Sequence, residues 1–160
     1  MGGVPRMANG GELTGSANAG ETASRVIRVA AALIVDDAGR LLLVRKRGTS
    51  VFMQPGGKYE PGESGAQTLI RELHEELGLI VAPDDLEPLG IFTAPAANEA
   101  GMVVEAEVFR VTIRESGAAD TIAAAAEIAA VRWVHPEEFG VVAVAPLVTE
   151  CMVPLLQQSP

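Results

Sequence analysis

Residues 55–79 read PGGKYEPGESGAQTLIRELHEELGL, and most of the fold can be predicted outward from them. Ser64 followed by Gln67 has the pattern of a capping box, and Gly78 stands where helices commonly end in the left-handed conformation. The stretch therefore predicts a helix over about residues 65–77. Its apolar side chains share one arc and are expected to pack on a sheet: Ala66, Leu69, Ile70, Leu73 and Leu77.

Three glutamates, Glu72, Glu75 and Glu76, occupy the neighbouring arc of this helix. Like charges spaced i, i+3 and i+4 cost an isolated helix about 0.2–0.5 kcal/mol per pair. A solvated face is the usual role of a Glu-rich helix. Here Pro55-Gly56-Gly57 brings a flexible turn just ahead of it, where a backbone carbonyl can join the carboxylates. Oxygen ligands of this kind suit Mg²⁺ together with substrate phosphates, so the pattern favours a metal site.

Strand-like segments flank the helix on both sides. An apolar run, residues 26–35, and a second run, residues 41–44, enclose the turn sequence 36–39 and predict a hairpin. Further strands are expected at 86–93, 102–113 and 130–134, and a terminal helix at 145–157, which Pro154 should kink or end. Strands around a central helix, followed by a second helix, indicate an α/β sandwich with a mixed sheet.

Composition narrows the range of partners. The chain of 160 residues is 48% hydrophobic, which predicts one domain over residues 25–160 behind a flexible, Gly- and Ala-rich tail at 1–24. No apolar run reaches membrane-spanning length and the N-terminus lacks the basic-then-apolar order of a secretory signal, so we expect a cytoplasmic protein without a membrane partner. The single cysteine, Cys151, cannot close an intrachain disulfide and is expected to be a small buried residue. The formal net charge of −9 opposes binding to long nucleic acids. A small phosphate compound remains a suitable partner if a cation lies between it and the carboxylates.

The spacing of Gly57, Glu63 and the segment 71–79 (RELHEELGL) resembles the Nudix box at every defined position. The resemblance extends over about residues 26–140. It implies the Nudix α/β/α sandwich with a mixed β-sheet and a hydrolase in which water attacks phosphorus in a diphosphate linkage. It also implies Mg²⁺, or Mn²⁺ in its place, held by the Gly56 carbonyl, Glu72, Glu75 and Glu76, with Glu72 as the candidate that activates water. Arg71 is expected to pair with Glu63 and to tie the loop to the helix.

Residues outside the box are expected to complete the site. Glu127, six residues before Trp133, resembles the loop acid of Nudix enzymes that cleave mutagenic nucleotides, and Glu99 is the competing candidate. Lys46 and Lys58 are candidate phosphate contacts. Phe52 and Gln54 are expected on the same strand face, where an aromatic ring can stack on a base and an amide can hydrogen-bond to it. The alternative is that both are only edge-strand residues. These assignments predict a small nucleotide-like diphosphate as substrate.

Other functions stay open at this stage. Within the hydrolases, a nucleoside di- or triphosphate is favoured, with ADP-ribose or a nucleotide sugar as the alternative. A non-catalytic nucleotide sensor on the same fold would be expected to lack one or more box carboxylates, whereas this chain retains them all. An isoprenoid diphosphate isomerase would need a further cysteine or acid near the reacting carbon, and Cys151 lies in an apolar helical segment. The positive mean hydropathy of +0.25 leaves room for a homodimer.

Overall fold

A computed structural model describes residues 25–114 and 121–158 of the chain. The expected flexible tail at residues 1–24 lies outside the described residues. In the described part no helix is long and apolar enough to cross a membrane.

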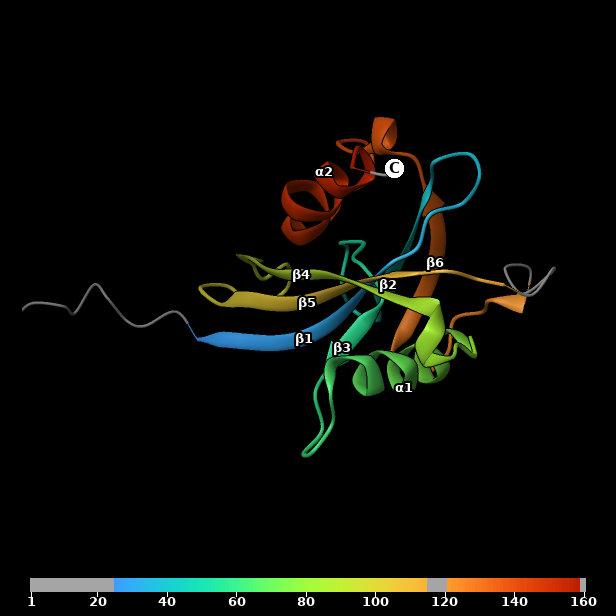
Figure 1. Ribbon diagram of the computed structural model, residues 1–160. Coiled ribbons are helices and arrows are strands. Elements are labelled where there is room, and N and C mark those ends of the chain that lie inside the picture. Colours follow the sequence, from blue (N-terminus) through green and yellow to red (C-terminus); the bar gives the residue numbers. More distant parts are fainter. Residues whose placement is uncertain (1–24, 115–120, 159–160) are drawn as a thin grey trace, which may run out of the picture.

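A mixed four-stranded sheet forms the centre of the molecule (Figure 1). Its order is β3 (Gly56–Lys58), β1 (Val26–Leu33), β5 (Val103–Val111) and β4 (Leu86–Pro95). Strands β1 and β5 are parallel, while the β1/β3 and β4/β5 pairs are antiparallel. Two further strands, β2 (Leu41–Lys46) and β6 (Ile128–Val134), form a separate antiparallel pair. Short 3₁₀ turns at Pro83–Asp85 (η2) and Pro136–Glu138 (η4) precede β4 and follow β6.

The predicted hairpin between residues 26–35 and 41–44 is wrong as a strand pair. Only its closing end is antiparallel, with a bridge between Val35 and Leu41 and a hydrogen bond from the Leu42 N–H to the Ile34 carbonyl. Beyond this end the strands diverge, because β1 finds its partners in β3 and β5 while β2 pairs with β6. The turn sequence was therefore recognised correctly, but the partners of each strand are set by distant segments.

Helix α1 (Gly65–Leu77) begins and ends where the sequence predicts. The Ser64 side chain accepts from the Gln67 N–H, the Gln67 side chain accepts from the Ser64 N–H, and Gly78 takes a left-handed φ of 66°. Its apolar arc is fully buried at Leu69, Leu73 and Leu77 and forms one core with the sheet. The cap and the core contact together fix the rotation of the helix about its own axis.

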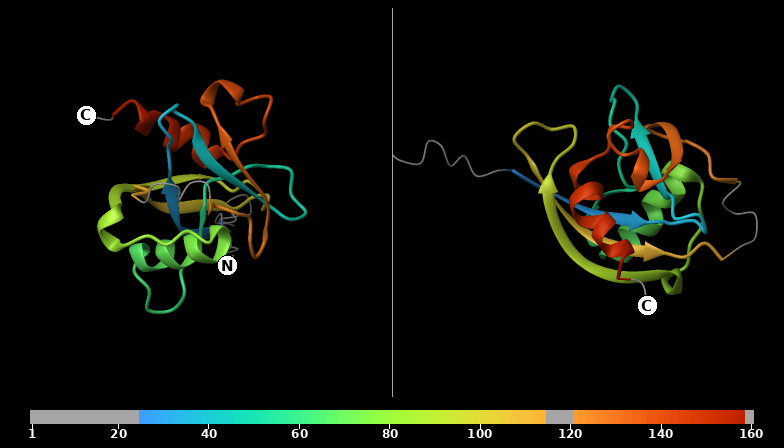
Figure 2. Two further views of the ribbon diagram at one scale, coloured as in Figure 1. Left: turned by 90° about the vertical axis from the view of Figure 1, so that its right-hand side faces the viewer. Right: turned by 90° about the horizontal axis from the view of Figure 1, so that it is seen from above.

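A second helical layer covers the opposite face of the sheet. A π-helical turn, η5 (Leu147–Met152), runs directly into α2 (Val153–Leu156), and Figure 2 shows this segment on the side of the sheet away from α1. Pro154 does not end the helix, because it falls in the first turn of α2, after the wide turn in which the Val153 N–H donates to the Val148 carbonyl. Strand β1 serves both cores, with Ala30 and Ala32 facing α1 and Ala31 and Leu33 facing the C-terminal helix. The α/β/α sandwich with a mixed sheet is confirmed.

Candidate active site

A cavity of about 750 Å³ opens between α1, β3 and the loops that follow β2 and β4. It gathers nearly all the residues that the sequence singled out, although they come from five separate stretches of chain: Lys46, Gln54, Gly56, Lys58, Glu72, Glu75, Glu76, Glu99 and Glu127. One wall is acidic and belongs to α1. Another part is apolar, with Ile27, Val29 and Val104 from β1 and β5. A molecule with a charged end and an apolar end would match this division.

Glu76 is the most deeply placed acid of the cavity, with only 6% of its surface exposed. The Gly56 N–H donates to its carboxylate at 3.4 Å. Burial raises the pKa of Glu76 to about 8, and the negative charges of Glu72 and Glu127 act in the same direction, whereas the Gly56 N–H and Lys46 lower it. No ion pair to Glu76 exists in residues 25–114 or 121–158. The ionised carboxylate therefore has no cation in direct contact, and the charge of Lys46 does not offset its burial.

Glu72 lies against the glycine turn. A Cβ at Gly57 would stand 2.3 Å from the Glu72 carboxyl carbon, so only glycine leaves space for the carboxylate to approach the backbone there. A Cβ at Gly56 would meet the Ala30 carbonyl oxygen at 2.1 Å, and the φ of Gly56 is 142°. The two adjacent glycines thus have different roles, one toward the strand β1 and one toward the acidic wall. Burial raises the pKa of Glu72 as well, although Arg71 opposes the shift.

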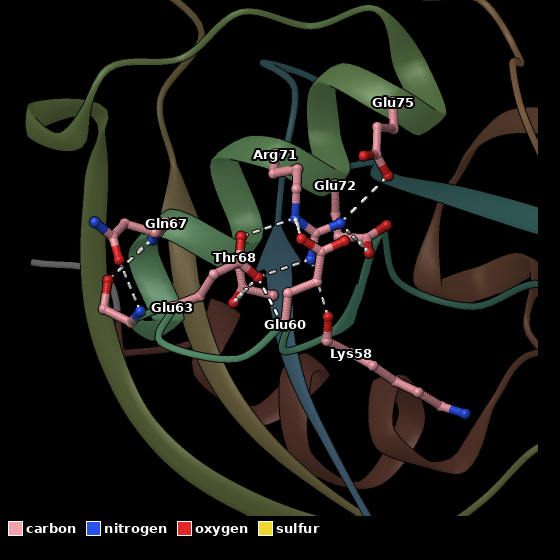
Figure 3. Close-up of polar contacts among 9 residues, drawn as sticks. Lys58, Glu60, Glu63, Gln67, Thr68, Arg71, Glu72 and Glu75 are labelled. Carbon is pink, nitrogen blue, oxygen red and sulfur yellow. Dashed lines mark hydrogen bonds and ion pairs between the residues drawn. The ribbon is translucent and has the colours of Figure 1, made fainter.

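Arg71 joins the acidic helix to the preceding loop (Figure 3). Its guanidinium forms a two-point hydrogen bond with Glu63, from Nε at 2.8 Å and from Nη2 at 2.9 Å. Nη2 also donates to the Lys58 carbonyl at 3.1 Å. The hydrogen bond from Arg71 is the main reason that the pKa of Glu63 falls to about 2. The expected clamp between loop and helix is present.

The remaining guanidinium nitrogen of Arg71 contacts the acidic wall itself. Nη1 lies 2.9 Å from a Glu72 carboxylate oxygen and 3.3 Å from one of Glu75, whose side chain is half exposed. Within the described parts of the chain, no three carboxylate, imidazole or thiol groups already converge on one point as a preformed metal cage. The three acids predicted as equivalent therefore differ, since two face an arginine and Glu76 has none.

The donor set nevertheless suits a hard divalent cation. Glu76 and Glu72 are carboxylates whose pKa values are raised, which means that burial outweighs the hydrogen bonds that their ionised forms receive in this structure. The space that Gly57 leaves open beside Glu72 supplies a close approach for a ligand. Oxygen ligands with uncompensated charge are the environment in which Mg²⁺ or Mn²⁺ binds.

Both candidate loop acids line the cavity. Glu127 stands just before β6, and its charge raises the pKa of Glu76. Glu99 lies in the loop after β4, and no such influence on Glu76 is seen. Electrostatic proximity to the buried carboxylate therefore favours Glu127.

The predicted substrate contacts are divided by the structure. Lys46, Gln54 and Lys58 line the cavity, and the Lys58 amine points away from Arg71 (Figure 3). Phe52 does not line it and instead packs against the core beneath the C-terminal helix, where its backbone bridges to Val144. The shared strand face expected for Phe52 and Gln54 is wrong, because residues 51–54 make only isolated bridges and do not alternate as a regular strand does.

Sequence reasoning missed several residues of the cavity wall: Arg47, Thr49, Met53, Asn98 and the apolar side chains of β1 and β5. Arg47 and Asn98 lie beside predicted candidates in sequence. The apolar residues carry no signal of their own, since a strand residue that lines a cavity has the same character as one that lies in a core.

A neighbouring hollow of about 800 Å³ shares Lys58 and Ile27 with this cavity. Two pairs of its polar side chains already contact each other. The Tyr59 O–H donates to Glu107 at 2.8 Å, and Arg28 pairs with Glu105 at 3.4 Å. Burial raises the pKa of Tyr59 to about 12, so the phenol stays protonated. The hollow is therefore less suited to chemistry than the acidic cavity.

The sequence is similar to a known protein family and to several of its characterised members. The family model of the NUDIX domain matches residues 25–156. An 8-oxo-dGTP diphosphatase of Haemophilus influenzae is 36% identical over 66 residues, which are 39% of this chain and 48% of that protein. An ADP-ribose pyrophosphatase of Methanocaldococcus jannaschii is 32% identical over 74 residues, 44% of this chain and 43% of that protein. The chain thus spans about half the length of these curated relatives.

Solved structures agree with this match. The E. coli ORF135 protein is 29% identical, with a TM-score of 0.57 over 84% of this chain and 88% of its own. A MutT protein from Methanosarcina mazei has the same fold at 22% identity, with a TM-score of 0.64 over 85% of this chain and 96% of its own.

Proposed function

This chain belongs to the Nudix family, whose domain covers residues 25–156, and on that premise we propose that it is a divalent-metal-dependent hydrolase. It uses water to cleave a diphosphate linkage in a nucleoside di- or triphosphate-type substrate. The observation that carries the proposal is the buried Glu76 carboxylate, which faces a cavity beside Glu72 and the glycine turn without a cationic partner in the described chain. A purely structural acid at this depth would be expected to have such a partner.

The residues that would hold the metal are Glu72, Glu75, Glu76 and the Gly56 carbonyl, with Mg²⁺ or Mn²⁺ as the ion. When bound, the ion would neutralise charge on the phosphate oxygens and on the carboxylates. Arg71 already neutralises part of the charge on Glu72 and Glu75, so the ion adds most beside Glu76. Glu63 keeps Arg71 in place through its two hydrogen bonds.

Glu72 is the residue we propose to take the proton from the attacking water. Its carboxylate is close to the backbone at Gly57, and its raised pKa makes it a better proton acceptor than an exposed glutamate. Glu127 is proposed to assist from the opposite loop, where its charge acts on Glu76. Lys46 and Lys58 stand on the cavity wall as contacts for the substrate phosphates. Gln54 is proposed to contact the organic part of the substrate.

The experiment is a substrate panel incubated with Mg²⁺ or Mn²⁺. It contains nucleoside triphosphates, modified nucleotides, ADP-ribose, nucleotide sugars and dinucleoside polyphosphates. We expect at least one member to be cut within a diphosphate bridge, and water enriched in ¹⁸O identifies the phosphorus that is attacked. If folded, metal-bound protein cuts no member, a non-catalytic nucleotide sensor becomes the better explanation.

ADP-ribose and nucleotide sugars are the alternative substrates. One relative named above is the ADP-ribose pyrophosphatase of Methanocaldococcus jannaschii. The fold is also shared with a bifunctional NMN adenylyltransferase/ADP ribose pyrophosphatase from Francisella tularensis, which was solved with AMP and a manganese ion. That protein is 19% identical, with a TM-score of 0.60 over 84% of this chain and 42% of its own. The products separate the alternatives. A triphosphate cut internally releases diphosphate and a monophosphate, whereas ADP-ribose gives AMP and ribose 5-phosphate.

The proposal also covers the size of the substrate, the location of the protein and its oligomeric state. An acidic chain with a cavity of nucleotide size is suited to small substrates rather than to long nucleic acids. We propose a cytoplasmic location, where such nucleotides are made. The homodimer remains a prediction that light scattering of the purified protein would test.

A further inference from the structure

Gln54 carries a buried oxygen that has no hydrogen-bond partner. Its Oε1 is withdrawn from solvent, and within residues 25–114 and 121–158 no group donates to it. The residue as a whole is half-buried and lines the acidic cavity. Buried polar atoms are nearly always paired, since an unpaired one destabilises the fold. Because the side chain lines the cavity while this oxygen has no exposed surface, a turn of the amide about its last side-chain bond would bring the oxygen to a donor from outside the chain.

The position of Gln54 shows which part of a ligand it would meet. On one side it follows Met53, which lines the cavity and packs against the core beside α1. On the other side it precedes Pro55 and Gly56, whose N–H contacts Glu76. Two residues of extended chain span at most about 7 Å, so the amide stands near the border between the apolar part and the acidic wall. A group attached directly to a diphosphate would lie at this border.

The chemistry of the oxygen restricts its partner further. Oε1 is an acceptor and requires an N–H or O–H donor. The ionised phosphates of a substrate offer only acceptor oxygens, so they cannot satisfy it. Nucleobase edges and sugar hydroxyls do offer donors, and side-chain amides pair with base edges through both of their polar atoms.

We propose that Gln54 is a specificity-determining residue, which accepts a hydrogen bond from an N–H or O–H group in the organic part of the substrate. The inference rests on the proposed function and adds a requirement that the diphosphate chemistry does not contain. The substrate must present a donor next to its diphosphate. A purely inorganic or hydrocarbon-linked diphosphate would leave the oxygen unpaired.

The test uses two kinds of non-hydrolysable probe, which differ only in the organic part. These are methylenediphosphonate and the α,β-methylene nucleoside diphosphates of the four common bases, with binding measured by calorimetry in Mg²⁺. Gln54→Met should weaken the tightest nucleoside probe about 10- to 100-fold and change methylenediphosphonate by less than about 2-fold. Gln54→Glu keeps an acceptor, so the ratio between the two probes should stay near the wild-type ratio although its added charge weakens both. Gln157→Met makes the same chemical change on the exposed end of the C-terminal helix and is the matched control.

Two further measurements separate the alternatives. A 2′,3′-dideoxy probe identifies the donor, because loss of the Gln54→Met effect assigns it to the sugar and persistence assigns it to the base. In ligand-free protein, Gln54→Met should unfold at the same temperature as wild type or higher, since it removes an unpaired oxygen.

Three outcomes would overturn the inference: equal weakening of both probes, no weakening of either, or a Tm several degrees lower than that of Gln157→Met. The proposed function fails in a different way. In that case the wild type cuts no member of the substrate panel, whatever Gln54 does to binding.

Discussion

Glu76→Gln is expected to raise the stability of the metal-free protein while removing its activity. The side chain is 6% exposed, and the pKa of Glu76 rises from 4.5 to about 8 mainly because of burial. A folded-state pKa above the unfolded value means that the folded protein binds the extra proton. The carboxyl therefore contributes stability below pH 4.5 that is lost as the pH rises to about 8.

The size of this loss of stability follows from the pKa shift of Glu76. At about 1.4 kcal/mol per pKa unit, the full shift would correspond to about 5 kcal/mol of unfolding free energy. Water and side chains that move toward the ionised group offset part of this, and the glutamine amide must itself be accommodated. We therefore expect a difference on the order of 2 kcal/mol between the wild type and Glu76→Gln above pH 8.

The assay is urea unfolding in EDTA at pH 5 and pH 8.5 for both proteins. The wild type should lose stability relative to Glu76→Gln over this interval, because the comparison cancels every group that the two proteins share. Glu75→Gln is the matched control, since it removes the neighbouring carboxylate, which is half exposed, and should keep the wild-type pH dependence. Saturating Mg²⁺ should stabilise the wild type at pH 8.5 much more than Glu76→Gln. Turnover of Glu76→Gln should fall at least about 100-fold.

Two results would refute this reasoning. Parallel pH dependences of the wild type and Glu76→Gln would show that the buried carboxylate is not destabilised by its surroundings. Near-wild-type turnover of Glu76→Gln in saturating Mg²⁺ would remove the residue from the site.

Three other predictions follow from the geometry. Glu127→Gln should raise the Mg²⁺ concentration needed for half-maximal rate more than it changes substrate KM, and a larger effect from Glu99→Gln would reverse the assignment of the loop acid. Gly57→Ala should lower turnover at least about 10-fold with an unchanged circular dichroism spectrum, because its Cβ would displace the Glu72 carboxylate. Gly56→Ala should instead lower the Tm, because its Cβ would meet the backbone of β1 at a positive φ. The opposite pattern would contradict the roles given to the two glycines. Glu63→Gln should be less stable than wild type above pH 4.5, and this difference should shrink as the pH falls toward 2, because the folded-state pKa of Glu63 is lowered; a difference that is constant with pH would show that the ion pair does not stabilise the fold.

Local signals in the sequence predicted the parts of the fold that depend on local interactions. Ser64, Gln67 and Gly78 define α1 to the residue, because caps act within one turn of the chain. The pairing of the strands could not be predicted from local sequence, because each partner lies far away in the chain. A turn sequence can close a hairpin end, as at residues 36–39, but it does not determine whether the strands stay together when β5 and β6 compete for them.

The candidate site shows the same division. Spacing placed the three glutamates on one helix, and the cavity does contain them all. Spacing did not show that Glu76 is buried while Glu75 is half exposed, because this depends on the rotation of α1 against the sheet. Phe52 was misplaced for a related reason, since period-two alternation applies only inside a regular strand.

The distribution of positive charge explains why the burial of Glu76 matters for function. Arg71 contacts the acidic wall directly, and its two-point bond to Glu63 leaves only Nη1 for Glu72 and Glu75. Arg71 makes no contact with Glu76, and the Gly56 N–H and the charge of Lys46 together do not offset the burial of Glu76. The uncompensated charge is therefore concentrated at the deepest acid. A helix whose three acids were all paired would be more stable, but it would have less affinity for a cation. The hydrogen bonds between Arg71 and Glu63 therefore hold α1 in place and also leave Glu76 free to bind a cation.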